Sequence, residues 1–399
     1  MKKSRILSLA LAGALSVSML AGCGGGDQGS ANTPAGGTET NSGNTAGAIK
    51  IGGIGPLTGS NAVYGQATKQ GAEIAIQEIN AMGGLQLVLN SQDDEGDTEK
   101  SLNAYNKLKD DGAQIIYGCT TTGPCVAVAA ETNSDRYFQI TPSASSTDVT
   151  AGKDNVFQVC FTDPNQGITA ANYIKDNNLG TKIAVIYNNG DPYSTGVYNA
   201  FQATADEIGL EVVTVQTFPD DSNTDFNVQL GAAKDADADL VFMPIYYTPA
   251  SLVLSQAKSM DYTPTFFGCD GMDGILDLKG FDTSLAEGLM LITPFNAWGE
   301  DERTKTFVAE YQEAYNGIPN QFAADGYDCM YAIYEACTAA GVTADMSAEE
   351  VCDALVAQFT ADGFSVDGLT GTGMTWSAAG EVSKAPVVVK VEGGVYVTQ

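Results

Sequence analysis

Three hydroxyl side chains stand together between a short apolar run and a helical pattern. The run Gln114–Tyr117 predicts a strand, Pro124 begins the helical pattern, and Thr120, Thr121 and Thr122 lie between them. Hydroxyl groups and the free N–H groups at a helix start both donate hydrogen bonds, so this loop could bind a carboxylate. The alternative is that a threonine here only caps the helix, and capping and binding can coexist.

Other polar side chains also follow predicted strands. Ser143 and Ser145 come after the strand that ends near Ile140, and Asp270 comes after the run Thr265–Phe267. A carboxylate at such a position could form a charge-assisted hydrogen bond with a cationic group. A serine-rich turn and an acidic surface turn are the alternatives.

Tyrosines follow strands as well. Tyr193 follows the predicted strand Ile183–Tyr187, and Tyr246 and Tyr247 follow Leu240–Pro244. A tyrosine ring can cover aliphatic surface while its hydroxyl reaches polar atoms, which suits the wall of a binding cleft. The chain has 17 tyrosines, so each of these could equally be an ordinary core or surface residue.

The elements that must position these side chains alternate between short apolar runs and helical patterns. This alternation begins with the predicted strand Ile49–Ile54, restarts after Phe157–Phe161, and is typical of an α/β protein with parallel sheets. Three helical patterns then follow Leu289–Thr293 without intervening strands, which indicates that the chain returns to cover a sheet already built. We therefore expect two interwoven lobes with crossings near residues 162, 294 and 374. Ligands of such sheets bind beyond the carboxyl ends of the strands, where the polar side chains above lie.

Composition excludes several functions. The chain of 399 residues has 19 Lys plus Arg against 49 Asp plus Glu, a net charge of −30, so we expect no nucleic-acid partner. Histidine is absent, which excludes Ser-His-Asp and Cys-His catalysis and any histidine-containing metal site. The acidic run Asp235–Asp239 lacks the glycine and the glutamate of a calcium loop, and no Gly-x-Gly-x-x-Gly motif is present. We expect no cofactor, no metal and no enzymatic activity.

The N-terminus has the pattern of an export signal. A basic start precedes the apolar stretch Ile6–Met19, which is too short for a permanent membrane helix. The sequence Leu-Ala-Gly before Cys23 resembles the lipobox of bacterial lipoproteins, so we expect residues 1–22 to be removed and Cys23 to be lipidated. Residues 23–48 are rich in glycine and predict a flexible linker. Seven other cysteines remain, an odd number that forbids complete pairing, and a link between Cys119 and Cys125 stays open.

Several separated motifs resemble type I periplasmic solute-binding proteins, most closely those that bind branched-chain amino acids for ATP-driven importers. The likeness spans about residues 49–398. Its motifs are Gly55-Pro56-Leu57-Thr58-Gly59 with Tyr64-Gly65, Glu78-Ile79-Asn80, Thr141-Pro142-Ser143-Ala144-Ser145, and Asp163-Pro164-Asn165-Gln166-Gly167.

The resemblance implies two doubly wound parallel-sheet lobes joined by three crossover segments, with the ligand in the cleft between them. We expect residues 49–162 with 295–374 to form the first lobe, and 163–294 with 375–399 to form the second.

The resemblance also implies roles for the polar side chains of the first lobe. Thr122, with Thr121 beside it, matches the position of a ligand-contacting hydroxyl. Ser143 would offer backbone groups and Ser145 a hydroxyl to a zwitterion, while Tyr64 would line the pocket for the ligand's side chain.

On the second lobe, the resemblance places an acid that pairs with the ligand's ammonium group at Asp270. Relatives often have Glu here, and the shorter Asp weakens transfer of their exact ligand. Tyr193 would close over the ligand, and family position favours Tyr246 over Tyr247.

These observations predict a lipid-anchored, extracytoplasmic substrate-binding protein of an ABC importer, with a small apolar amino acid as its ligand and permease subunits as its partners. We expect a monomer attached to the membrane only through its lipid. The alternatives left open are another amino acid, a small carboxylate such as an aromatic acid, a ligand-sensing ectodomain, and a surface hydrolase, for which the sequence supplies no nucleophile-base pair.

Overall fold

The computed structural model describes residues 47–219 and 224–399. Residues 1–22, Cys23 and the expected linker up to residue 46 lie outside this part. The expected linker is one residue too long, because Ala48 is already the first residue of a buried strand. In the described ranges, no helix combines the length and the hydropathy that a membrane crossing requires.

The first sheet has five parallel strands in the order β2-β1-β3-β4-β5. Its strands are β1 (Ala48–Gly55), β2 (Gln86–Asp93), β3 (Ile115–Gly118), β4 (Phe138–Thr141) and β5 (Val156–Gln158). The helices between them are α1 (Ala62–Met82), α2 (Thr98–Asp110) and α3 (Thr122–Asp135). Parallel strands need such crossover helices. Almost all residues of β1 and β3 are buried, because helices cover both faces of the sheet.

The second sheet has seven strands in the order β12-β11-β10-β9-β8-β6-β7. Its parallel strands are β6 (Ile183–Asn188), β7 (Val212–Phe218), β8 (Leu240–Met243), β9 (Thr265–Gly268) and β10 (Met290–Thr293). The connecting helices are α4 (Asp163–Asp176), α5 (Pro192–Ile208), α6 (Asn227–Asp235) and α7 (Tyr247–Ser259). Three short 3₁₀ helices follow β9, namely η2 (Asp270–Met272), η3 (Ile275–Asp277) and η4 (Thr283–Ala286).

The last two strands depart from the expected parallel pattern. β11 (Val387–Glu392) pairs antiparallel with β10, and β12 (Val395–Thr398) pairs antiparallel with β11. The turn between them is Gly393-Gly394, and both residues have positive φ angles of 62° and 81°. Glycine adopts this conformation without a steric penalty, which permits a two-residue hairpin.

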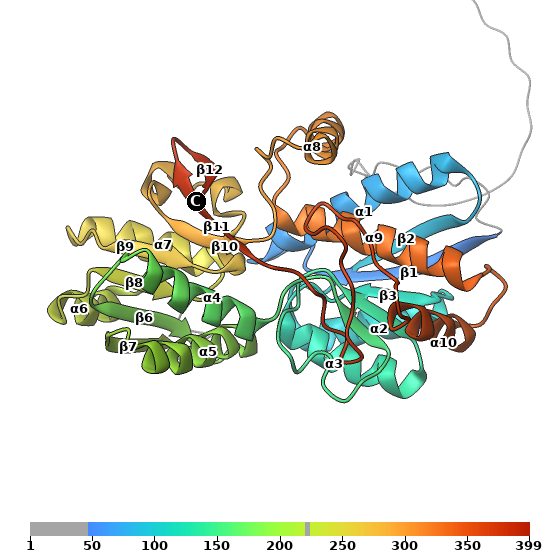
Figure 1. The fold of residues 1–399 in the computed structure, drawn as a ribbon, viewed down its shortest axis with the longest axis horizontal. Helices are drawn as coiled ribbons and strands as arrows, with labels where there is room; N and C mark the ends of the chain where they lie inside the picture. Colours follow the sequence, from blue (N-terminus) through green and yellow to red (C-terminus); the bar gives the residue numbers. More distant parts are fainter. Residues whose placement is uncertain (1–46, 220–223) are drawn as a thin grey trace, which may run out of the picture. The chain divides into compact units, whose positions relative to one another are not determined.

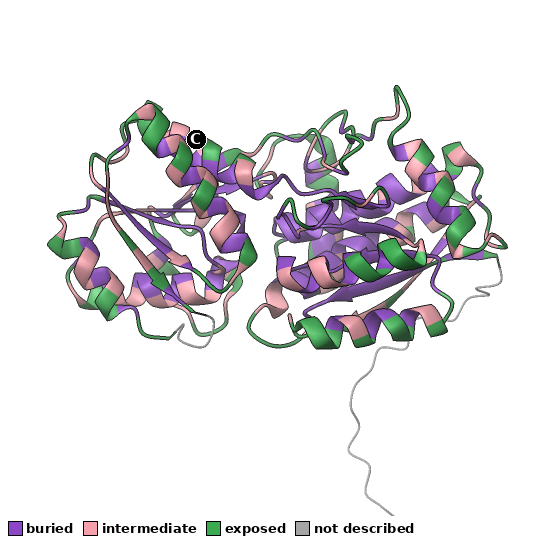
Figure 2. Cartoon of the chain, turned by 90° about the horizontal axis from the view of Figure 1, so that it is seen from below, coloured by how far each residue is buried: buried purple, intermediate pink, exposed green. Residues whose placement is uncertain are grey.

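Three late helices return to the first sheet, as the sequence pattern predicts. α9 (Gln321–Ala340) lies along α1, α10 (Ala348–Phe359) packs against β4, and α8 (Glu302–Tyr315) also reaches α1 (Figure 1). Gly71 permits a close contact between α1 and α9, because a Cβ atom at this position would lie only 1.8 Å from the Ala323 carbonyl oxygen. Figure 2 shows the buried strands of both sheets between helices whose outer faces are exposed.

The segment before β11 makes contacts with the first sheet. The Trp376 indole donates a hydrogen bond of 2.8 Å to the carbonyl of Gln158 in β5. Lys384 forms a fully buried ion pair of 2.7 Å with Asp325 of α9. The chain therefore joins the second sheet only after Lys384, whereas we expected a crossing near residue 374.

Candidate functional site

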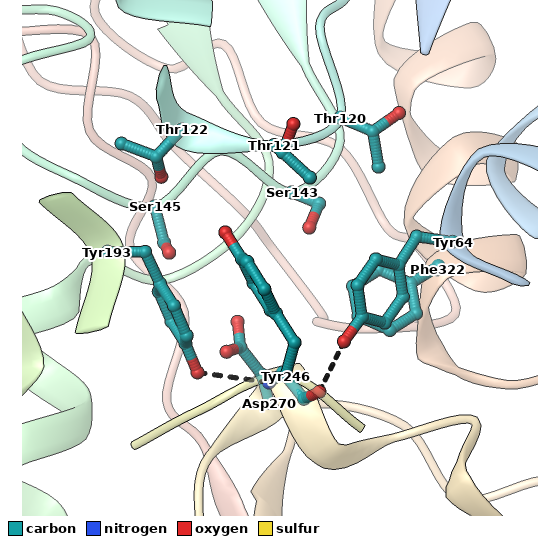
Figure 3. A pocket seen from close by; sticks show the side chains of 11 residues that line it. Tyr64, Thr120, Thr121, Thr122, Ser143, Ser145, Tyr193, Tyr246, Asp270 and Phe322 are labelled. Carbon is teal, nitrogen blue, oxygen red and sulfur yellow. Dashed lines mark hydrogen bonds between the residues drawn. The ribbon is translucent and has the colours of Figure 1, made fainter. Parts of the chain in front are cut away.

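One cavity collects the polar side chains that follow the strands of both sheets (Figure 3). The cavity is small, with about 10 Å³ of free volume. Its lining residues are Tyr64, Thr120, Thr121, Thr122, Ser143, Ser145, Tyr193, Tyr246, Asp270, Gly271 and Phe322. All eight residues that the sequence nominates for ligand binding are among them. The cavity lies beyond the carboxyl ends of parallel strands, as expected for ligands of open α/β sheets.

The threonine loop joins β3 to α3 and offers donors to this cavity. Thr121 is the N-cap residue of α3, yet its side chain forms no capping hydrogen bond. The Thr121 hydroxyl oxygen is buried and has no hydrogen-bond partner. Helix capping therefore does not explain this hydroxyl. Because an unpaired buried polar atom costs stability, a ligand in the cavity that bonded it would remove this cost.

The serine loop is held in place from behind. The Thr141 hydroxyl accepts a hydrogen bond of 3.0 Å from the Ala144 N–H, and the Gln158 amide donates one of 2.7 Å to the Ala144 carbonyl. Ser143 and Ser145, on either side of Ala144, both line the cavity. A loop fixed in this way presents its hydroxyls at defined positions, which a merely solvent-exposed turn would not.

Asp270 enters the cavity from the second sheet. Its side chain follows β9 and is 5% exposed, so Asp270 does not lie in a surface turn. Figure 3 shows its carboxylate pointing into the cavity, across from the threonine loop. Burial raises the pKa of this carboxyl to about 7, although the nearby side chains of Tyr193 and Gln166 act to lower it. A cation in the cavity would offset this cost of burial.

The backbone around Asp270 is also fixed. Its N–H donates a hydrogen bond of 3.1 Å to the Gln166 side-chain oxygen, and its carbonyl accepts one of 2.8 Å from the Gln321 amide. Gln166 belongs to α4 and Gln321 to α9. Asp270 is therefore held by helices that pack on different sheets.

Aromatic rings form the remaining walls. Tyr193 and Tyr246 stack with ring centroids 5.1 Å apart, and Tyr64 packs edge-on against Tyr246 at 5.6 Å. The Tyr64 hydroxyl donates to the Gly271 carbonyl and accepts from the Tyr247 N–H, so α1 and the loops of the second sheet meet at this ring. The choice of Tyr246 over Tyr247 agrees with this geometry, because only Tyr246 lines the cavity.

Three lining residues were not among the nominated ones. Thr120 stands in the nominated loop, and Gly271 directly follows Asp270. Phe322 is different because it lies in the first turn of a helix rather than after a strand. The centroid of its ring lies 4.4 Å from that of the Tyr64 ring. The signal for this helix start was present, because Asn320 caps α9 by accepting from the N–H groups of Phe322 and Ala323.

The lining of the cavity carries no lysine or arginine. A neighbouring pocket that shares Thr121 and Tyr246 with the cavity also has none, while Glu95 and Asp191 line it. In the described part of the chain, no group of three or more Cys, Asp or Glu side chains could hold a metal ion. The seven cysteines there are buried free thiols, so the link between Cys119 and Cys125 is not formed.

Comparisons with known proteins agree with this architecture. The sequence profile of a periplasmic binding protein family matches residues 48–394. Leu/Ile/Val-binding protein homolog 3 of Brucella melitensis is 29% identical over 340 residues, which cover 84% of this chain and 89% of that protein.

Two solved structures are also similar. The branched-chain amino acid transporter substrate-binding protein LivJ of Streptococcus pneumoniae, solved with isoleucine, superposes with a TM-score of 0.78 at 26% identity, covering 88% of this chain and all of that one. An ABC-transporter solute-binding protein of R. palustris, solved with benzoate, gives a TM-score of 0.79 at 20% identity, covering 88% of this chain and 95% of that one. The latter likeness concerns the fold alone.

Proposed function

This chain belongs to the periplasmic binding protein family and is a substrate-binding protein of the ABC-transporter type, and we propose that its ligand is an amino acid with a branched-chain or other small apolar side chain. Members of this family carry solutes and are not enzymes. The observation that supports the proposal most is the buried Asp270 carboxylate, which faces the threonine and serine hydroxyls across one cavity that contains no basic side chain.

The two ends of an amino acid match the two sides of this cavity. In our proposal the ligand carboxylate accepts hydrogen bonds from the Thr121 and Thr122 groups at the start of α3, where the helix dipole also favours a negative charge. The ligand ammonium pairs with Asp270, and the ligand side chain lies against the rings of Tyr64 and Phe322. Micromolar affinity requires only about −8 kcal/mol, which a few such hydrogen bonds and apolar contacts can supply.

Ligand binding would favour closure of two lobes around the cavity. We propose a first lobe of residues 49–162 with 295 to about 384, and a second lobe of 163–294 with the remaining C-terminal residues. The later third boundary follows the contacts of Trp376 and Lys384 with the first sheet. A ligand held by Thr121 from one lobe and by Asp270 from the other stabilises the closed form, in which the permease would recognise both lobes together.

We further propose that the protein acts at the outer face of the cell membrane as a monomeric lipoprotein. The support is the sequence alone, namely the short apolar stretch before Leu-Ala-Gly-Cys23 and the glycine-rich linker after it. Lasting attachment requires more than one acyl chain. Metabolic labelling with a fatty-acid analogue, with Cys23→Ser as the control, tests this part separately.

The four aromatic rings support one second candidate, an aromatic carboxylate such as benzoate. Tyr193 and Tyr246 stack almost in parallel, at 5°, and a ring could pack among them and Phe322. Such a ligand has no ammonium group, so Asp270 would be an unpaired buried acid beside it. This cost makes the amino acid the better candidate.

A thermal-shift panel of the twenty amino acids plus benzoate and 4-hydroxybenzoate tests the proposal. A ligand at about one hundred times its dissociation constant adds roughly 2.7 kcal/mol of stability. We expect one or a few apolar amino acids to stabilise the wild-type protein, and Asp270→Ala to lose this response.

Asp176→Ala, which removes an exposed acid of α4, serves as the matched control and should respond like wild type. Stabilisation by benzoate alone, unaffected by Asp270→Ala, would favour the aromatic acid. A flat panel would contradict both candidates.

A further inference from the structure

One buried acid near the cavity has no partner. Asp163, the first residue of α4, is 1% exposed, and neither of its carboxylate oxygens forms a hydrogen bond. The side-chain nitrogen of Gln166, one turn later, is also buried and unpaired. Two other buried acids have partners within the protein. Asp328 accepts three hydrogen bonds from Leu369 and Thr370, and Asp325 pairs with Lys384.

The first turn of α4 contacts both sides of the ligand cavity. The Asp163 N–H donates a hydrogen bond of 2.9 Å to the Ser145 carbonyl, which joins this turn to the serine loop. The Gln166 side-chain oxygen accepts the Asp270 N–H at 3.1 Å, which joins the same turn to the acid of the second sheet. The unpaired carboxylate therefore lies directly behind a residue that lines the cavity.

The surroundings leave Asp163 little freedom to turn away. A Cβ atom added at Gly196 in α5 would lie 2.7 Å from one of its oxygens, so α5 closes the opposite side. The Ser145 hydroxyl is near enough to lower the pKa of the Asp163 carboxyl, although it forms no hydrogen bond with it here. Ser145 is thus the cavity residue through which Asp163 can act.

We propose that Asp163 is a positioning residue for the ligand's ammonium group, acting through Ser145 as the second acid of the site beside Asp270. This inference rests on the proposed function. When the ligand enters, the Ser145 hydroxyl donates a hydrogen bond to the Asp163 carboxylate, and its lone pairs then face the cavity. It then accepts a hydrogen bond from the ammonium, which Asp270 binds from the other side.

This arrangement fixes the direction in which the ligand lies. A serine whose hydrogen is used by a carboxylate can only accept a further hydrogen bond from the ligand. Ser145 therefore belongs to the ammonium end, while Thr121 and Thr122 hold the carboxylate end. A ligand without an ammonium group would leave two buried acids uncompensated, which excludes simple aromatic acids more strongly than Asp270 alone does.

Charge in this region predicts a linked proton release. Burial raises the pKa of Asp163, and so do Asp270 from the loop after β9, Asp191 at the start of α5 and Asp148 from the loop after β4. The buried base of the region, Lys384, is already paired with Asp325. An arriving ammonium favours the ionised carboxyls, so the site releases protons to the buffer as it binds, and the affinity rises with pH until both acids are ionised in the empty protein.

Isothermal titration of L-leucine, or of the amino acid that most stabilises the wild-type protein, tests the inference at pH 7. Titrations in phosphate and in Tris, whose ionisation enthalpies differ, give the number of protons released. For Asp163→Asn we expect roughly tenfold weaker binding and fewer released protons. Asp148→Asn, the matched control at an exposed acid that also acts on Asp163, should keep the affinity of the wild-type protein.

Two further measurements separate positioning from a structural role. The unliganded Asp163→Asn protein should melt no lower than wild type, because the substitution removes a buried carboxyl group that has no hydrogen-bond partner. Ser145→Ala should weaken binding and reduce proton release in the same direction, and adding Asp163→Asn to it should cause little further loss, because the two act in series.

The outcomes are distinct. If the wild-type protein binds no amino acid, the proposed function fails and this inference fails with it. If the wild-type protein binds but Asp163→Asn keeps both its affinity and its proton release, only this inference is overturned. If Asp163→Asn does not fold, the proton release of Ser145→Ala decides, and an unchanged value overturns the inference.

Discussion

Replacing Asp270 by asparagine should stabilise the ligand-free protein more at pH 8 than at pH 5. Burial raises the pKa of Asp270 from 3.8 to about 7. Because the folded-state pKa is raised, ionisation of Asp270 costs stability, and this cost grows as the pH rises from about 4 and is complete above about 7. Three pKa units correspond to about 4 kcal/mol at pH 8, against about 1.5 kcal/mol at pH 5. Asparagine removes this pH-dependent cost. It adds a cost that does not depend on pH, about 1–3 kcal/mol, for burying an amide group without hydrogen-bond partners.

The difference in unfolding free energy between the variant and the wild type should therefore change by about 2.5 kcal/mol in favour of the variant between pH 5 and pH 8. Urea unfolding followed by fluorescence measures this difference at both values. Asp176→Asn, which removes an exposed acid of α4, is the matched control and should behave like the wild-type protein at both pH values. A difference for Asp270→Asn that does not depend on pH would refute the reasoning, because the carboxylate would then not be held in a desolvated site.

Two further predictions concern the packing of helices and the buried ion pair of Lys384. Gly71→Ala should destabilise the protein by about 3 kcal/mol or more, since its Cβ would lie 1.8 Å from the Ala323 carbonyl oxygen. Gly231→Ala in α6, where a Cβ would have no atom within 4 Å, should stabilise the protein by about 1 kcal/mol. Thermal melting of both variants checks these two expectations, and equal shifts in melting temperature would contradict them. Lys384→Met should cost about 3–5 kcal/mol at pH 8 by leaving Asp325 buried without its partner, and less at pH 5, where Asp325 takes up a proton. The double variant Lys384→Met with Asp325→Leu should recover most of the loss in urea unfolding, and a loss equal to that of the single variant would argue against the buried pair.

The sequence was informative about the site because chemistry and topology coincide in this fold. Thr121, Ser145, Tyr193 and Asp270 each follow a predicted strand, and parallel strands bring their carboxyl ends to one edge of a sheet. Their residue types alone left capping, turns and surface positions open. Their common position after strands, together with the family motifs, selected them, and all four line one cavity.

Phe322 shows where this reasoning ends. It stands at the start of a helix that returns to the first sheet after the whole second sheet has been built. Its place beside Tyr64 depends on the close crossing of α1 and α9, which Gly71 permits. A rule about strand ends gives no reason to choose it.

Asp163 shows a second limit. The sequence marks it as part of a family motif, but the motif does not say to which element Asp163 belongs. The structure begins α4 at Asp163, with Pro164 in the first turn, where proline's lack of an N–H carries no penalty. Burial without a partner is a property of the packed chain and cannot be read from residue order.

The amino-acid sequence by itself determined the α/β architecture, the alternation that builds two sheets, and the residue types that gather at the strand ends, because local periodicity and turn chemistry act over a few residues. Tertiary packing alone decided which carboxylate and hydroxyl oxygens are removed from contact with water. It set the raised pKa of Asp270, left Asp163 without a partner, and kept the chain on the first sheet as far as Lys384. Desolvation depends on the side chains that surround a group in space, and those come from segments far apart along the chain.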